Sequence, residues 1–129
     1  MILHLDTHAF LWFVWDDPRL PASVSDAIED PANTVFVSVV SLWEIGLKSS
    51  IGKLAVKLPL DDFFAENVDG NGFQVLPITR AHIIRVHSLP FHHRDPFDRL
   101  LIAQSLADGM TFVSDDSQAA AYGVPLRWK

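Results

Sequence analysis

Acidic side chains occur at four widely separated places where the sequence predicts a strand to end or a helix to begin: Asp6, Glu44, Asp98 and the Asp115–Asp116 pair. Carboxylate oxygens are the ligands that hard cations such as Mg²⁺ and Mn²⁺ prefer. A cation held in this way can activate a water molecule and stabilise negative charge on a phosphodiester. Metal-dependent phosphoester hydrolysis is therefore the chemistry that these residue types favour.

Asp98 has the most unusual setting of these acids. The sequence places Asp95 at the N-cap of a helix, Pro96 at its first position and Asp98 at its third, where each residue type is favoured. Residues three and four apart share a helix face, which aligns Asp98 with the apolar Leu101 and Ile102. A carboxylate that borders a core is costly unless it is paired or bound to metal. We therefore expect Asp98 to have partners elsewhere in the chain.

Each acid also has an ordinary structural explanation. Asp6 and the Asp115–Asp116 pair can cap the helices that follow them. Glu44 can form an ion pair with Lys48 one turn later, or complete a capping box with Ser41. From the residues alone, structural and catalytic roles both remain open.

Predicted strands alternate with predicted helices along the chain. We expect strands at residues 2–5, 35–37, 73–76 and 110–113, with a possible edge strand at 126–128. We expect helices at residues 7–15, 22–29, from Ser38 or Ser41 to 50, 60–68, 79–88 and 96–107, and a short one through 121. This order predicts an α/β fold, a three-layer sandwich with a mainly parallel central sheet of about four to five strands. Ligands of such sheets bind beyond the carboxyl ends of the strands, where the four groups of acids can meet.

Length and composition indicate a single domain over residues 1–129. The 129 residues are 49% hydrophobic, which favours a packed core over a disordered chain. The sequence has no cysteine, which excludes disulfides, thiolate nucleophiles and cysteine-based zinc sites. The first apolar run has no basic region before it and no run reaches membrane-spanning length, so we expect neither a signal peptide nor a membrane span.

The net charge of −6 argues at first against nucleic acid, since phosphate binding usually needs a basic surface. If several acids converge on one cation, however, the remaining charge is nearer balance. Lys48, Lys53, Lys57, Arg94 and Arg99 could then form a basic rim. Solvated surface is the ordinary interpretation of these side chains.

Four sequence motifs in order resemble those of the PIN domain family, and more narrowly the VapC-type ribonuclease toxins of bacterial toxin–antitoxin pairs. The motifs are Leu-Asp-Thr-His at 5–8, Ser-Val-Val-Ser-Leu-Trp-Glu-Ile at 38–45, His-His-Arg-Asp-Pro-Phe-Asp-Arg-Leu-Leu-Ile-Ala at 92–103 and Val-Ser-Asp-Asp at 113–116. Leu76-Pro77-Ile78 and Tyr122-Gly123-Val124 also fit. Each motif is weak alone, but the four together at compatible spacing are specific.

The resemblance implies a cytoplasmic, Mg²⁺- or Mn²⁺-dependent endoribonuclease that acts as a toxin. Its catalytic acids would be Asp6, Glu44, Asp98 and Asp116, with Asp6, Asp98 and Asp116 on the metal. Ser41 and Ser114 match hydroxyl positions that orient these acids. The family's last motif favours Asp116 over Asp115, and the extra acid at Asp115 leaves that choice open.

The resemblance also implies partners, namely a homodimer and a small antitoxin that wraps the toxin and blocks its site. The apolar stretch from Phe10 to Trp15, with Trp43, is a candidate for either contact. His92, His93, Arg94 and Arg99 adjoin the predicted site and are candidates for contact with RNA. Adjacent histidines on a loop are more often polar surface, so this role is an expectation only.

Two other classes of function compete with the nuclease. A metal-dependent phosphatase or a receiver-like phosphoacceptor could have a similar fold, but Asp6 is followed by Thr7 and His8 and not by the acids that those proteins carry. A non-catalytic PIN-like interaction module is the third interpretation. The presence of all four expected acids argues against it.

Overall fold

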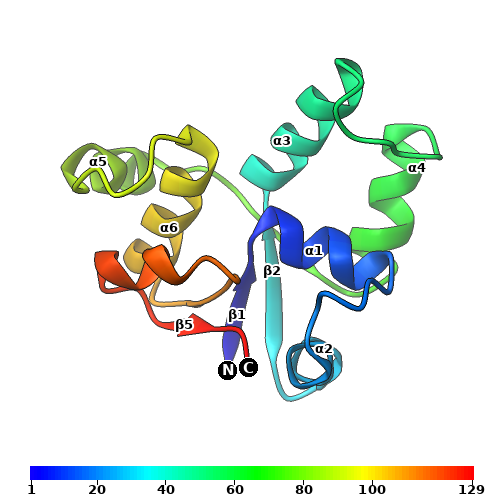
Figure 1. Cartoon of the computed structure of the whole chain (residues 1–129), viewed down its shortest axis with the longest axis horizontal. Coiled ribbons are helices and arrows are strands. Elements are labelled where there is room, and N and C mark those ends of the chain that lie inside the picture. Colours follow the sequence, from blue (N-terminus) through cyan, green and yellow to red (C-terminus); the bar gives the residue numbers. More distant parts are fainter.

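A five-stranded, wholly parallel sheet forms the centre of the computed structural model, which describes residues 1–129 (Figure 1). The strands are β1 (Ile2–Leu5), β2 (Thr34–Ser38), β3 (Gln74–Leu76), β4 (Thr111–Val113) and β5 (Leu126–Arg127), in the order β3-β2-β1-β4-β5. In the register of the three central strands, Leu5 lies beside Val37 on one side and Val113 on the other. The predicted α/β class is confirmed, and the possible edge strand is present as β5.

The strand order creates a crevice at one particular place. The chain runs from β1 outward through β2 to β3, and then crosses to place β4 on the other side of β1. Connections leave β1 and β4 in opposite directions at such a switch point, so a gap opens beyond their carboxyl ends. Asp6 follows β1 directly and Ser114 follows β4. The topology therefore brings two of the acidic motifs to the position where ligands bind in open α/β sheets.

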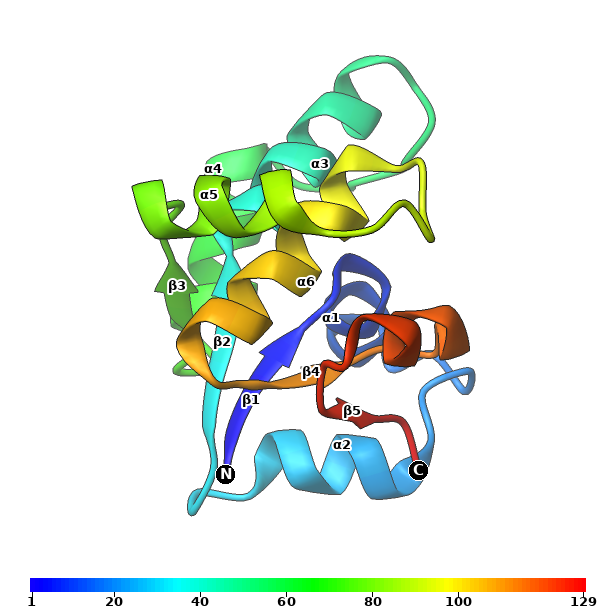
Figure 2. The same ribbon diagram turned by 90° about the vertical axis from the view of Figure 1, so that its left-hand side faces the viewer.

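Helices cover both faces of the sheet (Figures 1 and 2). The helices are α1 (Thr7–Val14), α2 (Ala22–Glu29), α3 (Val39–Ser50), α4 (Leu60–Phe64), η1 (Ala65–Asp69), α5 (Arg80–Ser88), α6 (Pro96–Asp108) and η2 (Ser117–Tyr122). Side chains alternate across the strands, so Leu3 and Leu5 pack with α1 and α2 while Phe112 packs with α6 and η2 on the opposite face. The three-layer arrangement follows from these two separate cores.

The helix starts agree with the capping signals of the sequence. Asp6 caps α1 by accepting a hydrogen bond from the Ala9 amide at 2.7 Å. Asp95 caps α6 through the Phe97 amide at 2.8 Å, with Pro96 at the first helical position. Ser38, and not Ser41, is the N-cap of α3. Ser41 is thereby left inside the helix, where its hydroxyl faces α1.

The expected helix over residues 60–68 differs from the structure in its second half. The α-helix ends at Phe64 and continues as the π-helical turn η1, in which the Gly70 amide donates to the Ala65 carbonyl. A π turn holds more residues than an α turn, which rotates Val68 toward the side of Phe63. Both side chains are buried in the first core. Burial of Val68 therefore explains the wider turn, which the apolar periodicity does not reveal.

The apolar α1 helix is mostly enclosed. Phe10 and Leu11 are buried, and Trp12 and Phe13 pack partly against the same core. Among the apolar side chains from Phe10 to Trp15, only Trp15, at the C-cap, is exposed. The structure has no helix with both the length and the apolar character needed to cross a membrane.

A buried histidine ties the central strand to the helix that carries Asp98. His4 lies on the α6 face of β1, and its Nδ1 is 2.7 Å from the Ser105 hydroxyl. Burial lowers the pKa of His4 to about 3, so its imidazole is neutral at physiological pH. This neutral contact fixes the position of α6 relative to β1, and thus of Asp98 relative to Asp6.

Candidate functional site

A cavity of about 150 Å³ lies at the carboxyl ends of β1 and β4. Acids from four segments line it, together with one lysine, one histidine and one serine: Asp6, His8, Glu44, Lys48, Asp95, Asp98, Ser114, Asp115 and Asp116. Every acid in the set predicted from the sequence therefore contributes to a single cavity. Of the predicted supporting residues, Ser114 and Asp115 also line it, while Ser41 lies behind Glu44.

Asp6 is buried at the end of the central strand. One of its carboxylate oxygens caps α1, and burial raises the pKa of the side chain to about 6. The Ser114 hydroxyl and the Ala9 amide offset part of this rise. A carboxylic acid in this setting binds a proton or a cation more readily than an exposed aspartate.

Asp98 is half-buried at the start of α6 and faces other acids. Burial raises its pKa to about 6, and the charges of Asp95 and Glu44 add to the rise. No side chain or amide donates a hydrogen bond to its carboxylate. Asp98 therefore has no hydrogen-bonded protein partner of the kind that the sequence led us to expect. The carboxylates of Asp95, Glu44 and Asp116 repel it, and the attraction of His93 and Lys48 offsets only part of this.

Glu44 is buried and tightly held from two sides. Thr7 Oγ1 donates to Glu44 Oε1 at 2.6 Å, and Lys48 forms an ion pair with Oε2 from the next turn of α3. Ser41 Oγ lies 3.0 Å from Thr7 Oγ1 and completes the group. The Lys48 pair was one of the structural alternatives for Glu44, and it is present. The role of Thr7 was missed, although its place directly after Asp6 puts it at the same sheet edge.

Asp115 and Asp116 differ in their surroundings. Asp116 caps η2 through the Gln118 amide at 3.0 Å and also contacts His93 Nε2. Asp115 is exposed, and its charge contributes to the raised pKa of Asp6. Both acids line the cavity, so the choice between them as the fourth acid rests on the sequence motif.

The four candidates for RNA contact occupy three kinds of position. His92 and Arg94 are exposed on the segment between α5 and α6. His93 is turned inward against Asp116. Arg99 is only 7% exposed, and its guanidinium donates to the carbonyls of that segment. The structure thus gives Arg99 a place inside the fold and not in the expected basic rim, because its guanidinium is used by the carbonyls of Val86, Leu89 and Pro90.

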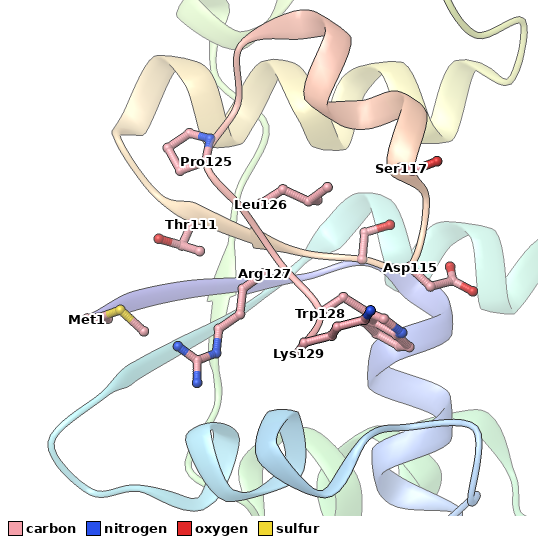
Figure 3. A pocket seen from close by; sticks show the side chains of 10 residues that line it. Met1, Thr111, Asp115, Ser117, Pro125, Leu126, Arg127, Trp128 and Lys129 are labelled. Carbon is pink, nitrogen blue, oxygen red and sulfur yellow. The ribbon is translucent and has the colours of Figure 1, made fainter.

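A larger, more open hollow of about 760 Å³ adjoins the acidic cavity (Figure 3). Ser114 and Asp115 line both spaces. Figure 3 shows Asp115 at one end of the hollow, with Trp128 and Lys129 beside it and Arg127 closer to Met1. Neither basic side chain has an acidic partner within ion-pair distance, and free cations beside an acidic cavity are a setting in which a phosphate backbone can lie.

The PIN domain family model matches residues 3–124. This chain belongs to the PIN domain family. The match includes all four acidic motifs and nearly the whole described fold.

Solved structures with a similar fold come from toxin–antitoxin complexes. VapBC2 from Rickettsia felis bound to a promoter DNA fragment matches with a TM-score of 0.73 and 16% identity over 100% of both chains. FitAcB from Neisseria gonorrhoeae matches with a TM-score of 0.63 and 19% identity over 98% of this chain and 96% of that chain. VapBC-5 from Mycobacterium tuberculosis matches with a TM-score of 0.59 and 17% identity over 98% and 95%. The comparison with curated proteins gave no match. At these identities the likeness shows the fold of this PIN domain.

The side chains of the PIN-domain cavity suit a hard divalent cation in their chemistry. The donors are carboxylate and hydroxyl oxygens, and the raised pKa values of Asp6 and Asp98 show that their negative charges are under-compensated. No group of three or more acidic or histidine side chains is already arranged to hold an ion. We therefore expect cation binding at the PIN-domain site to draw these carboxylates together.

The two raised pKa values predict an unusual dependence of stability on pH. An acid whose pKa rises from 3.8 to about 6 on folding makes the native state bind more protons than the unfolded state between those pH values. The free energy of unfolding then falls as pH rises from about 4 to 7. The Asp6→Asn, Asp98→Asn double variant has neither of these acids. Without divalent cations, we expect it to melt about 3 °C or more above the wild type at pH 7.5.

The difference in melting temperature between the double variant and the wild type should vanish near pH 4.5, where both acids of the wild-type protein carry a proton. Thermal melts in EDTA across this pH range measure it. A double variant that melts below the wild type at pH 7.5 would contradict the prediction.

Proposed function

We propose that this PIN domain is a Mg²⁺- or Mn²⁺-dependent endoribonuclease and the toxin of a toxin–antitoxin pair. The observation that carries the proposal is the convergence of Asp6, Glu44, Asp98 and Asp116 on one cavity at the topological switch point. Like charges gathered in this way destabilise the fold unless a cation or a proton compensates them. Stability alone does not explain such an arrangement, whereas phosphodiester chemistry does.

Each acid has a role in this proposal. Asp6, Asp98 and Asp116 would hold the cation, which activates water and stabilises charge on the phosphate when bound. Glu44 is fixed by Thr7 and Lys48, so its carboxylate can orient the attacking water without reaching the cation itself. Ser114 contacts Asp6, and Ser41 supports Glu44 through Thr7.

RNA would approach across the open side of the cavity. His92 and Arg94 on the segment before α6 and Arg127 and Lys129 beside the larger hollow are exposed or partly exposed. Cations on both sides of a cluster of acids can hold the backbone of a strand while its scissile phosphate lies over the acids. A cytoplasmic location is part of the same proposal.

The experiment that tests this function uses total RNA. The purified protein is incubated with RNA in Mg²⁺ or in EDTA, and new ends are mapped by sequencing. We expect cleavage at a limited set of sites in Mg²⁺ and none in EDTA. Cleavage that is equal in both conditions would exclude the proposed chemistry.

A metal titration separates the nuclease from a non-catalytic PIN-like module. Saturating Mn²⁺ should raise the melting temperature of the wild type by about 10 °C at a concentration 100-fold above the dissociation constant. Asp6→Asn keeps the cap of α1, since asparagine is also a good N-cap, but should reduce the shift to about 1 °C or less. Equal shifts in both proteins, or none in either, would favour the interaction module.

An antitoxin would cover apolar surface on α1 and α3. Trp43 is 58% exposed on α3, and Leu47, Ile51 and Trp15 are also exposed. A hollow of about 720 Å³ lies nearby, lined by Val14, Trp15, Leu54, Ala55, Leu58 and Phe63 among others. A member of the VapBC family of toxin–antitoxin systems has a similar fold, which supports a small antitoxin as the partner, while the exposed apolar side chains are what favour this surface.

The homodimer would use a different face. Ile83 and Ile84 on α5 are 50% and 64% exposed, and Val75 and Ile78 near β3 are exposed as well. Helix α5 packs against α6, on the opposite face of the sheet from α1, so a dimer contact through Ile83 and Ile84 leaves the antitoxin surface free.

A further inference from the structure

The segment between α5 and α6 borders the acidic cavity and is held by Arg99. The Arg99 guanidinium donates to the carbonyls of Pro90 at 2.7 Å, Val86 at 3.2 Å and Leu89 at 3.3 Å. The Phe91 ring lies over the guanidinium at 4.1 Å. The contacts with Leu89 and Pro90 hold the first residues of the segment by their carbonyl oxygens, and the contact with Val86 joins them to the end of α5.

Tyr122 holds the second half of the same segment by its amides. The phenol oxygen accepts hydrogen bonds from the His92 amide at 3.0 Å and the His93 amide at 2.8 Å. It also lies 3.1 Å from His93 Nδ1, and the two rings stack with centroids 5.4 Å apart. One side chain of η2 thus binds both the backbone and the ring of His93.

The hydrogen-bonding capacity of the phenol settles the direction of its contact with the ring. A tyrosine hydroxyl has two lone pairs and one hydrogen, and the two amides use both lone pairs. The phenol hydrogen is therefore free to donate to His93 Nδ1. This nitrogen must then accept the hydrogen bond, so it carries no hydrogen of its own. The other ring nitrogen, Nε2, then bears the hydrogen and donates it to the Asp116 carboxylate.

We propose that Tyr122 is a positioning residue, which holds His93 in the Nε2–H tautomer so that the imidazole orients Asp116 for the proposed reaction. This inference rests on the proposed function for its catalytic consequence. Asp116 is the N-cap of η2 and Tyr122 is its last residue, so both ends of one short helix contact the same imidazole. His93 Nε2 donates to one carboxylate oxygen of Asp116, and the Gln118 amide donates to the other at 3.0 Å. The remaining lone pairs of the carboxylate are left for the cavity that Asp116 lines.

Residues that hydrogen-bond to metal ligands, without touching the metal themselves, affect metal affinity and activity. Loss of such a partner commonly costs 10- to 100-fold in metal affinity or activity. For Tyr122→Phe we expect about a 10-fold fall in kcat for RNA cleavage. KM should change by less than about 2-fold, because Arg94, Arg127 and Lys129, none of which hydrogen-bonds to Tyr122, still bind the RNA.

The first test reads the tautomer directly and needs no activity. Two-dimensional ¹H–¹⁵N spectra of the histidine rings identify which nitrogen bears hydrogen, and His93→Gln assigns the signals. We expect the wild-type His93 to show a protonated Nε2 and an unprotonated Nδ1, and Tyr122→Phe to show a mixture of tautomers. A protonated Nδ1 in the wild type, or an unchanged spectrum in Tyr122→Phe, would overturn the proposal.

The second test asks whether Tyr122 acts through the ring or only through the backbone. The glutamine of His93→Gln can still donate to Asp116 but has no tautomer to fix. Tyr122→Phe should therefore cost less than about 2-fold in the His93→Gln background, against about 10-fold in the wild type. Equal losses in both backgrounds would mean that the phenol merely holds the segment. If neither protein cleaves RNA while the tautomer result stands, the proposed nuclease function fails and the positioning contact does not.

Discussion

Asp98→Asn is expected to lower Mg²⁺-dependent RNA cleavage by at least about 100-fold while the protein stays folded. Asparagine has nearly the same volume, so α6 and its packing on the sheet are preserved. It carries no charge, so it cannot compensate a divalent cation as a carboxylate does. Since no hydrogen bond in the fold depends on the Asp98 carboxylate, its loss removes chemistry without removing a structural contact. Single-turnover cleavage of a mapped RNA substrate measures the effect.

Asp95→Asn is the matched control for this experiment. Asp95 lies three residues earlier and lines the same cavity, but its carboxylate is used in capping α6. Asparagine caps helices about as well as aspartate. We expect this variant to retain cleavage within about 5-fold of the wild type. If Asp98→Asn cleaves RNA as fast as Asp95→Asn, Asp98 has no part in the reaction.

Phe10→Ala is expected to lower the free energy of unfolding by about 3–5 kcal/mol. Phe10 is fully buried in α1, and its ring makes edge contacts with Phe63 and Phe73 at centroid distances of 6.4 and 6.3 Å. Truncation leaves a cavity that the surrounding β1, α4 and η1 cannot fill. Because α1 begins at Asp6 and Thr7, the loss should also loosen the acidic site. Urea unfolding, followed by tryptophan emission, measures the change.

Trp15→Ala is the control for Phe10→Ala. It removes a larger aromatic ring from the end of the same helix, where the side chain is exposed. We expect a loss of about 1 kcal/mol or less. Similar losses from both variants would mean that α1 is not anchored through Phe10.

The sequence was sufficient for the elements and for the gathering of the acids. The caps at Asp6 and Asp95 are local signals, and the structure uses both of them. The strands alternate with helices, which fixed the α/β class. From the parallel sheet it followed that acids after β1 and β4 share an edge. The cavity predicted in this way is present, although its catalytic use is still a prediction.

Contacts between segments that are distant in the chain could not be predicted from the sequence. Nothing near Arg99 reveals that three carbonyls would enclose its guanidinium, so it was expected on the surface. The phenol of Tyr122 meets His93 across 29 residues of chain. Such contacts depend on how α6 and η2 pack, which periodicity and propensity do not specify. The π turn of η1 could not be predicted either, because it depends on the burial of a single side chain, Val68.

The strand order determines when the acidic cavity can exist during synthesis. β4 pairs with the first strand of the chain but is the fourth to be made, and Asp115 and Asp116 come directly after it. A ribosome-bound chain that ends before residue 116 has Asp6 and Glu44 but no complete cluster. Under the proposed function, a nascent chain therefore gains its RNA-cleaving site only after residue 116 has been made and β4 has paired with β1.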